Sequence, residues 1–537
     1  MDKFKTLIRD ILKVSKITKT SKKKRRILLS VFLSNLIVFF DILIILVFTN
    51  IFTSNNNFQN ILVEFVMQNL YIFPVIILMR FASIYYEKLN VIKLKLNIEE
   101  NLRTHFVKEI FDKGNYSVSD AYYFITTISM QVASFYGTLT VFLSTALQIL
   151  AYTGYLIYSD LNTVGVFLIG LLILAYPTYF LTQKGRQYAH LTYEYGQDIS
   201  KETEKILDNL FLIKIINLVS SEVDNFKKSL HSYYDSEYNN RRFGTLNAIL
   251  PNFSTMILLS THLVFFNFVR VLTLDFVGVM LRLFQTLGVF NDNLHLISAY
   301  HVYLENLYLM ESNKSISYSE NFELGHELKP NEAVVLSEVS FKYFNSSDYI
   351  FEDLNLTLPK GKHVIVTGVN GSGKSTLLGL IAGVFYAEKG IVKVSSRKLG
   401  YVGVSPMILN STLRENLLYG IQETINDTEL ERMLSLFKLF NENERQLDRR
   451  ISNKSLSMGQ MQKIAFIRAL LSKVEVLILD ESTSNLDEES KQLIFKILED
   501  ERLTIINSTH NKDDFKNMDL HIELVVTDDG KRKLEVN

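Results

Sequence analysis

The distribution of hydrophobic residues divides the chain into two unlike halves. The first half contains six runs of about twenty mostly apolar residues, each long enough to cross the ~30 Å hydrocarbon layer of a membrane as a helix. Six such runs in succession favour membrane spans over buried core helices of a large soluble protein. We therefore predict a polytopic α-helical membrane domain whose six spans are Ile27–Thr49, Ile61–Ile84, Val132–Tyr158, Val164–Thr182, Asn247–Val269 and Phe276–Ile297.

Basic residues between the runs indicate the orientation of the spans. Five Lys and Arg residues directly precede the first run, and many more lie in the long connections around Lys93–Lys113 and Lys184–Arg242. The other three connections contain only Arg270. Because Lys and Arg are enriched on the cytoplasmic side, both termini and both long connections are predicted to be cytoplasmic. The first run is too long for a signal-peptide core, so we expect a retained anchor.

The two long connections continue the helical pattern beyond the membrane. Tyr85–Phe111 and Gln183–Arg242 keep apolar residues at helical spacing and contain few helix breakers. We therefore expect long cytoplasmic helical extensions with tips near Gly114–Phe124 and Leu210–Ser220. A simple surface loop domain is the alternative.

Several charged or polar residues lie within the spans, namely Asp41, Arg80, His262, Arg282 and Asp292. Charge inside a membrane is costly and marks a functional site by default, whereas snorkelling or a wet inner cavity is the simpler interpretation. Residue counting places Asp41 and Arg282 in the same outer half, where they could form an ion pair.

The second half has a different pattern. After the membrane domain of residues 1–315, a polar stretch predicts a linker at residues 316–330. Residues 331–537 then alternate short β-branched strands with helices, which is typical of a soluble α/β domain.

The segment HVIVTGVNGSGKSTLLGLIAG, residues 363–383, contains a phosphate-binding loop between a strand and a helix. Its glycines let backbone N–H groups surround phosphate, and the helix N-terminus adds partial positive charge. We expect Lys374 to reach the β- and γ-phosphates of a nucleotide and the Ser375 hydroxyl to bind Mg²⁺. The predicted phosphate-binding residues are Gly368, Asn370, Gly371, Ser372, Gly373, Lys374, Ser375 and Thr376.

A second strand, Val474–Asp480, ends in two adjacent carboxylates. Beside a phosphate-binding loop, Asp480 suits the Mg²⁺ shell, so Ser375 and Asp480 are the predicted metal ligands. Glu481 is placed to polarise an attacking water.

With these motifs, the chain resembles half-transporters of the ATP-binding cassette (ABC) exporter type, and the resemblance covers essentially the whole chain. Leu456–Gln460 is similar to the LSGGQ signature, and Ser484–Asp487 is similar to the D-loop. His510 matches the switch histidine, and Tyr343 resembles the aromatic residue that stacks on adenine. The ordered set of motifs is specific to the family, so the α/β domain is expected to be a P-loop NTPase cassette.

The resemblance implies ATP and Mg²⁺ as ligands and two cassettes that dimerise head to tail. It further implies nucleotide contacts from Tyr343, Ser457, Gly459, Gln460 and Asp487, with Glu481 and His510 as catalytic residues. The partner is therefore expected to be a second half-transporter, in a homodimer or a heterodimer. The tips of the extensions resemble the family's coupling helices.

Two departures from the family pattern bear on hydrolysis. Val404 stands where the family has the Q-loop Gln, after Gly403 in place of Pro, and Met458 replaces a signature glycine. An aliphatic side chain cannot bind Mg²⁺ or orient water, and Met adds bulk where backbone must approach phosphate. Because the other catalytic positions are retained, an active ATPase is still the favoured prediction.

Composition narrows the function classes. The 537 residues include 57 basic and 57 acidic ones, which argues against a nucleic-acid binder that relies on overall basicity. The absence of Cys excludes disulfides, a thiol nucleophile and Cys-ligated metal sites, and disfavours export that depends on a leader-cleaving Cys protease. The zero net charge is the sum of two unlike parts. The membrane half has its Lys and Arg almost entirely on one side of the membrane, and the cassette is mildly acidic.

These observations predict ATP-driven export or flipping of a lipid-linked glycan, lipid, peptide or other amphipathic substrate. The predicted location is the bacterial cytoplasmic membrane, because the composition is rich in Asn, Lys and Ile and the chain is of half-transporter size. The alternatives are an ATP-binding membrane regulator and one half of a heterodimer with weak hydrolysis at this chain's site.

Overall fold

A computed structural model describes the chain apart from residues 1, 21–23, 54–60, 114–117, 160, 267–272, 313–317, 326–327, 344–347, 441–445, 501–502, 510–517, 528–531 and 537. It divides into two compact units. The first comprises Met1–Ile110 and Tyr116–Ser315, and the second comprises Phe111–Asn115 and Ile316–Asn537.

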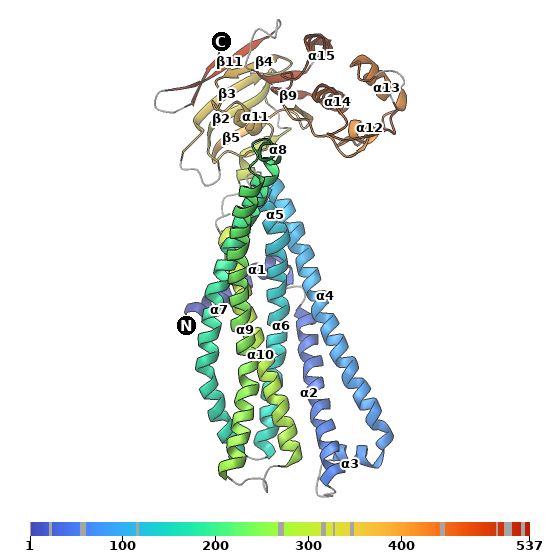
Figure 1. Ribbon diagram of the computed structural model, residues 1–537. Coiled ribbons are helices and arrows are strands. Elements are labelled where there is room, and N and C mark those ends of the chain that lie inside the picture. The colour runs from blue at the N-terminus through green and yellow to red at the C-terminus, as the bar shows by residue number, and fades with distance from the viewer. Residues whose placement is uncertain are drawn as a thin grey trace. The chain divides into compact units, whose positions relative to one another are not determined.

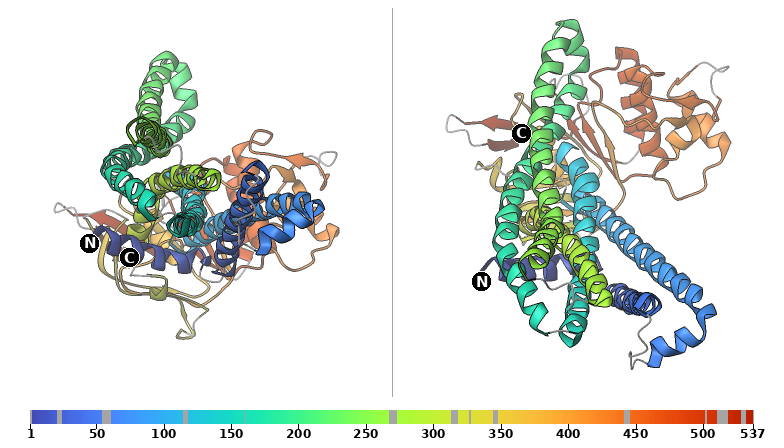
Figure 2. Two further views of the ribbon diagram at one scale, coloured as in Figure 1. Left: turned by 90° about the horizontal axis from the view of Figure 1, so that it is seen from below. Right: turned by 60° about the horizontal axis from the view of Figure 1, so that its bottom comes forward.

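The first unit is helical. Its helices are α1 (Asp2–Ile17), α2 (Lys24–Thr53), α3 (Ile61–Gln68), α4 (Phe73–Lys113), α5 (Val118–Tyr123), α6 (Ser129–Ser159), α7 (Leu161–Asp208), α8 (Leu210–Ile215), α9 (Val219–Phe266) and α10 (Leu274–Ser312). Helices α6, α7, α9 and α10 run side by side, and α1 crosses the bundle and contacts α10 (Figures 1 and 2). Helices α7 and α9 have 48 residues each, about 72 Å, which is more than twice the thickness of the hydrocarbon layer.

Within the described residues, four helices are long and apolar enough to cross a membrane. They are Lys24–Phe52, Leu70–Phe111, Ser119–Ser159 and Leu274–Leu309. Of the other two predicted spans, Val164–Thr182 falls in α7, and residues 247–266 of Asn247–Val269 fall in α9. Residues 267–269, and some side chains of both spans, lie outside the described residues. The helical unit thus has several membrane-length helices that continue well beyond a bilayer's thickness.

The second predicted span was wrong in its bounds. Residues 61–84 do not form one helix, because α3 ends at Gln68 and α4 begins at Phe73. Val63 and Val66 of α3 are buried against α2, so these apolar residues serve packing between helices. Pro74 is the second residue of α4, where its missing N–H leaves no helical hydrogen bond unmade.

A polar cluster joins four helices of this unit, and we call it the Asp41 cluster. The Asp41 carboxylate on α2 accepts hydrogen bonds from Arg80 Nε on α4 at 2.5 Å and from Tyr152 Oη on α6 at 2.9 Å. Arg282 Nε on α10 lies 3.9 Å from the same carboxylate. The expected ion pair between Asp41 and Arg282 is therefore present, although Arg80 is the closer partner. The side chain of His262 lies outside the described residues.

The tip predicted at Leu210–Ser220 lies between α7 and α9 and contains the short helix α8. Most of its apolar side chains are exposed, with Phe211 at 79% and Ile215 at 64%, whereas Ile213 is buried. In the other predicted tip, residues 114–117 lie outside the described residues, and α5 follows them.

The second unit is an α/β domain with two main sheets. The six-stranded sheet has the order β12-β11-β4-β10-β9-β6, and the four-stranded sheet has the order β1-β5-β2-β3. The strands are β1 (Phe322–Leu324), β2 (Glu332–Phe341), β3 (Phe351–Pro359), β4 (His363–Gly368), β5 (Lys389–Val394), β6 (Leu399–Val402), β7 (Ser411–Thr412), β8 (Arg450–Ile451), β9 (Val476–Asp480), β10 (Thr504–Ser508), β11 (Leu520–Val526) and β12 (Arg532–Val536). The helices are α11 (Lys374–Ile381), α12 (Leu413–Leu417), α13 (Asp427–Leu436), α14 (Met458–Leu471) and α15 (Glu488–Asp500).

Part of the segment predicted as a linker, residues 316–330, is folded into the second unit. Phe322–Leu324 form β1, which pairs in parallel with β5. The Phe322 ring packs against Gly383, where an added Cβ would come within 2.6 Å of it. A three-residue strand in a polar stretch has too little periodicity to be recognised, so only the packed sheet reveals it.

Candidate nucleotide-binding site

The register of the six-stranded sheet places the ends of four parallel strands along one edge. Strands β4, β10, β9 and β6 are parallel neighbours. Ser508 at the end of β10 pairs with Val366 of β4 on one side and with Asp480 of β9 on the other. In open sheets of this kind, ligands bind at the carboxyl ends of the strands. This edge is therefore where the predicted phosphate loop and Asp480 meet.

The phosphate loop follows β4 and leads directly into α11. Gly371 and Gly373 have φ of +80° and +103°, a left-handed backbone that side chains other than Gly rarely adopt. Lys374 is largely buried, and its Nζ donates to the carbonyl oxygens of Gly368 at 2.9 Å and Val369 at 3.3 Å. These contacts fold the ammonium group over the loop, so its charge lies at the N-terminus of α11.

The two predicted metal ligands come together. Ser375 Oγ donates to Asp480 Oδ1 at 3.2 Å, and Asp480 is 9% exposed. A hydroxyl and a carboxylate are hard oxygen donors, which is the donor type that Mg²⁺ prefers. The pair therefore fits a site for the magnesium ion that accompanies a nucleotide.

Glu481 occupies an unusual backbone position immediately after Asp480. Its φ is +49°, and its backbone N–H donates to the Ser508 carbonyl at 3.1 Å. Ser484 then bonds the Glu481 carbonyl through both its N–H and its hydroxyl. These bonds hold a strained residue at the strand end, as occurs at functional sites. His510 lies outside the described residues, and Thr509 before it donates its backbone N–H to the Val366 carbonyl.

Tyr343 lies beside the phosphate-loop helix. Its Oη is 2.7 Å from Thr376 Oγ1, and its ring packs edge-on against Phe341 and Phe385. The residue is 40% exposed, so part of it is accessible to a ligand. The aromatic residue predicted to contact adenine is thus connected to the predicted phosphate-binding residues.

The signature segment forms the start of α14, and its polar side chains cap that helix. Gln460 N–H donates to Ser457 Oγ at 3.2 Å, and Ser457 N–H donates to Gln460 Oε1 at 2.9 Å. This is a capping box, which satisfies two backbone donors at the helix start. Gly459 faces Asn485 and Leu486, and Met458 is 39% exposed.

Asp487 also caps a helix. Its Oδ1 accepts the Ser490 backbone N–H at 2.7 Å at the start of α15. This hydrogen bond, which stabilises the carboxylate form, holds the pKa of the Asp487 carboxyl below its ordinary value. Three predicted nucleotide contacts, Ser457, Gln460 and Asp487, thus already have structural roles in helix capping.

Part of this domain is similar to a known protein family. Residues 351–484 match the family model for the ABC transporter domain. This part of the chain is similar to ABC transporters. The solved structure of a bacterial Atm1-family ABC exporter with ATP bound has the same fold, with a TM-score of 0.76, 15% sequence identity and coverage of 96% of this chain and 95% of that chain. The chain therefore shares the fold of that exporter structure, a long-helix unit followed by an α/β unit, as the resemblance implied.

Curated relatives include transporters of different cargo. A mesentericin transport/processing ATP-binding protein of Leuconostoc mesenteroides is 24% identical over 355 residues, which cover 60% of this chain and 48% of the relative. An ATP-dependent lipid A-core flippase of Vibrio parahaemolyticus is 31% identical over 216 residues, which cover 37% of each chain. The chain spans about half the length, or less, of the curated relatives that it matches.

Within the cassette, the signature helix and the phosphate-loop helix belong to different parts of the core. Helix α11 contacts β4, β5, β9 and β10, whereas α14 contacts α12 and β6. Leu377 and Leu378 of α11 lie in one hydrophobic cluster, and Ile464 and Phe466 of α14 lie in another. The structure therefore groups Tyr343, the phosphate loop and Asp480 through direct contacts, whereas Ser457 and Gly459 lie on a helix that packs in the other cluster.

Tyr401 is a candidate site residue that the sequence analysis missed. It lies on β6, and its Oη is 3.5 Å from Asp480 Oδ2. Desolvation beside that carboxylate raises the pKa of Tyr401, so the phenol stays protonated and donates to Asp480. A Cβ at Gly403 would come within 2.6 Å of Tyr401 Oη. The Gly in place of the family's Pro thus leaves room for the phenol beside Asp480. Val404 is 41% exposed.

Arg532 is a second missed residue. It lies on β12, and its Nη2 donates to the Gly371 carbonyl in the phosphate loop at 3.3 Å. No motif marks a basic residue so far from the loop in sequence. Only the pairing of β12 with β11, and of β11 with β4, brings this cation to the loop.

Proposed function

We propose that the chain is one half of an ATP-driven exporter that moves an amphipathic or lipid-linked cargo out of the cytoplasm across a bacterial cytoplasmic membrane. The observation that carries the proposal is the grouping of Lys374, Ser375 and Asp480 at one edge of a parallel sheet. The described part of the same chain also contains four membrane-length helices. The ABC cassette family supports ATP as the nucleotide.

The residues of the site suit phosphate-transfer chemistry. Magnesium-bound ATP would supply the transferable phosphate, with Ser375 and Asp480 as protein ligands of the metal. Lys374 and the backbone N–H groups of the phosphate loop would neutralise the phosphate oxygens. Glu481, held at the strand end by its bond to Ser508, would orient the attacking water and accept its proton.

A second cassette would complete the site. Ser457 and Gly459 lie at the N-terminus of α14, in a different core cluster from α11. A helix N-terminus binds phosphate well, so these residues are suited to the γ-phosphate held by a partner's phosphate loop. We therefore propose a dimer, with a second copy of this chain as the partner. Closure of the dimer on ATP would then be driven by the higher affinity of the closed state.

The exposed apolar tip around α8 is suited to transmitting that closure. Leu210, Phe211, Leu212 and Ile215 are all exposed on a short helix between two helices of 48 residues. Rigid helices of this length would pass a movement of the tip to the membrane spans. The relatives' names include a mesentericin transporter and a lipid A-core flippase, so peptide and lipid-linked cargo are both within the proposed range.

The test is ATP hydrolysis by the purified full chain in lipid vesicles. Glu481→Gln is expected to lower the hydrolysis rate by about two orders of magnitude or more, because the water loses its base, while ATP binding is retained. Glu499→Gln, at an exposed position of α15, is the matched control and is expected to change neither. Intact ATP binding without measurable hydrolysis by the unaltered chain would contradict the exporter and favour an ATP-binding regulator.

A further inference from the structure

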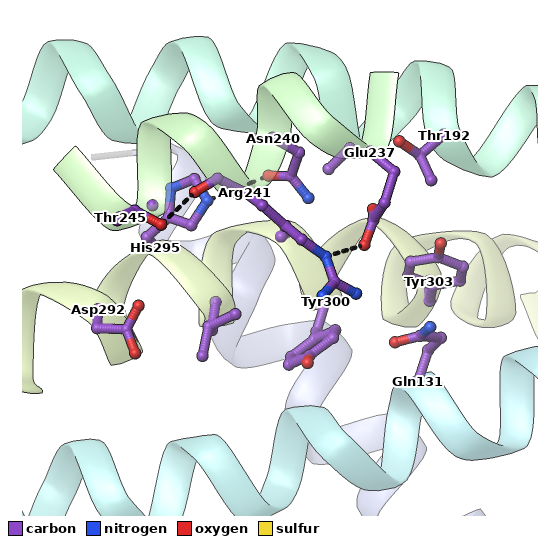
Figure 3. A pocket seen from close by; sticks show the side chains of 14 residues that line it. Gln131, Thr192, Glu237, Asn240, Arg241, Thr245, Asp292, His295, Tyr300 and Tyr303 are labelled. Atoms are coloured by element: carbon purple, nitrogen blue, oxygen red, sulfur yellow. Dashed lines mark hydrogen bonds and ion pairs between the residues drawn. The ribbon is translucent and has the colours of Figure 1, made fainter. Parts of the chain in front are cut away.

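A polar cavity lies within the helical unit, between α6, α7, α9 and α10. Its volume is about 340 Å³, comparable with the smaller ligand sites of proteins. Figure 3 shows the charged and polar side chains that point into it, mainly from α9 and α10. In the proposed orientation the lining residues lie near the cytoplasmic ends of the spans, because Thr192 follows one predicted span and Thr245 precedes another.

One wall of the cavity is fixed by His295 of α10. The imidazole is 2% exposed and fits between two glycines of neighbouring helices. A Cβ at Gly185 of α7 would come within 2.0 Å of the ring, and a Cβ at Gly244 of α9 within 2.6 Å. Glycine is a poor helix former, so its presence in both helices reflects the close approach of the ring.

His295 does not contribute a charge to the cavity. Its Nε2 lies 3.1 Å from Asn240 Oδ1 and donates to it. Its Nδ1 is buried without a hydrogen-bond partner among the described residues. A protonated ring would leave a buried N–H unpaired, which is strongly unfavourable, so the neutral tautomer with hydrogen on Nε2 is the one that fits.

The remaining charges leave one carboxylate uncompensated. Arg241 Nε donates to Glu237 Oε1 at 2.6 Å, so these two side chains neutralise each other. Asp292 has no hydrogen-bond or ion-pair partner within the part of the chain that the structure describes. Figure 3 shows its carboxylate on α10, apart from the Glu237–Arg241 pair. The lining therefore carries one net negative charge, located at Asp292.

Apolar and aromatic groups continue from Asp292 along the same helix. Leu296 and Tyr300 also line the cavity, and they follow Asp292 at four-residue intervals, which places all three on one face of α10. An aromatic ring attracts a cation through its face, and Leu296 offers an apolar surface beside the charge. This arrangement suits a molecule with an ammonium group and an apolar body.

We propose that this cavity binds the ammonium group of an amine-bearing amphipathic cargo, with Asp292 as the counter-charge. The inference rests on the proposed export function and names the substrate class of the same protein. An anionic head group is disfavoured because the guanidinium of Arg241 is already paired. Cationic amphiphiles also concentrate at the anionic cytoplasmic leaflet, next to which the cavity lies in the proposed orientation.

The experiment measures binding of two fluorescent probes to the full chain in vesicles without nucleotide. Dansylcadaverine carries a primary amine, and its N-acetyl derivative is neutral but otherwise matched. The unaltered protein is expected to bind the amine about tenfold more tightly than the acetylated probe. Asp292→Asn should abolish this preference, and Asp292→Glu, which keeps the charge, should retain it.

Asp235→Asn is the matched control, because Asp235 lies on α9 but is exposed and outside the cavity lining. It is expected to leave both affinities unchanged. Equal affinity for the two probes, a preference unaffected by Asp292→Asn, or tighter binding of the anionic probe dansylglycine would each overturn the inference. Because no nucleotide is present, failure here is distinct from failure of the Glu481→Gln hydrolysis test, which concerns the proposed export function.

Discussion

The nucleotide site and the Asp41 cluster both join residues that are distant in sequence, but different forces position them. Ser375 and Asp480 are 105 residues apart, and Tyr152 and Asp41 are 111 apart. In the cassette, a hydrogen-bonded strand register fixes Asp480 beside the phosphate loop. Between helices no such register exists, so the Asp41 cluster depends on side-chain hydrogen bonds and ion pairs alone. The helical cluster should therefore be the more easily broken by one substitution.

The largest effect is expected for Asp41→Asn. Arg80 and Arg282 would lose the carboxylate that compensates them within the apolar unit, which costs about 3 kcal/mol in buried pairs. Thermal unfolding of the full chain in detergent, followed by circular dichroism, should show a lowered midpoint. Asp224→Asn, at an exposed position of α9, is the matched control. Equal midpoints for the two variants would show that the cluster contributes no stability.

A smaller effect is expected for Tyr401→Phe. This variant tests whether the Tyr401 hydroxyl takes over the role of the Gln that Val404 replaces. Loss of the hydroxyl that donates to Asp480 should lower the hydrolysis rate roughly threefold to tenfold, about 0.6–1.4 kcal/mol in barrier height. The affinity for magnesium, measured from the metal dependence of the rate, should fall as well. Tyr401 is a positioning residue in this view.

Val404→Ala is the comparison for Tyr401→Phe, since the Val404 side chain has no polar atom to lose. It should leave both the rate and the magnesium dependence unchanged. If Tyr401→Phe has no more effect than Val404→Ala, the phenol serves packing only.

The smallest effect is expected for Ser457→Ala. Removing the cap of α14 should lower stability by about 0.5–1 kcal/mol, because one backbone donor loses its partner. Gln460→Ala should give a similar loss, and the double variant should cost less than the sum, because each cap depends on the other. Unfolding midpoints measure this coupling. Strict additivity would argue that the two side chains act independently.

The site residues differ in how far the sequence could predict them. The phosphate loop and Asp480 follow from motifs whose strand and helix context is readable in the chain. Tyr401 could have been suspected as a site residue, because it lies three positions before Val404, where the family has Gln. A side chain as long as Tyr can reach from the end of one strand to the next. Arg532 and the cavity around Asp292 could not be predicted, since they require strands and helices from separate parts of the chain to be packed first.

The sequence by itself determined the division into a membrane-type helical domain and a P-loop cassette, because apolar periodicity and local motifs dictate element type and backbone conformation. It could not determine that Ile61–Gln68 forms its own helix, or that Phe322–Leu324 joins the sheet. Nor could it show that Asp41 has two arginine neighbours or that Asp292 is left unpaired in a cavity. Those outcomes depend on which side chains meet when helices pack, and only the tertiary structure decides that.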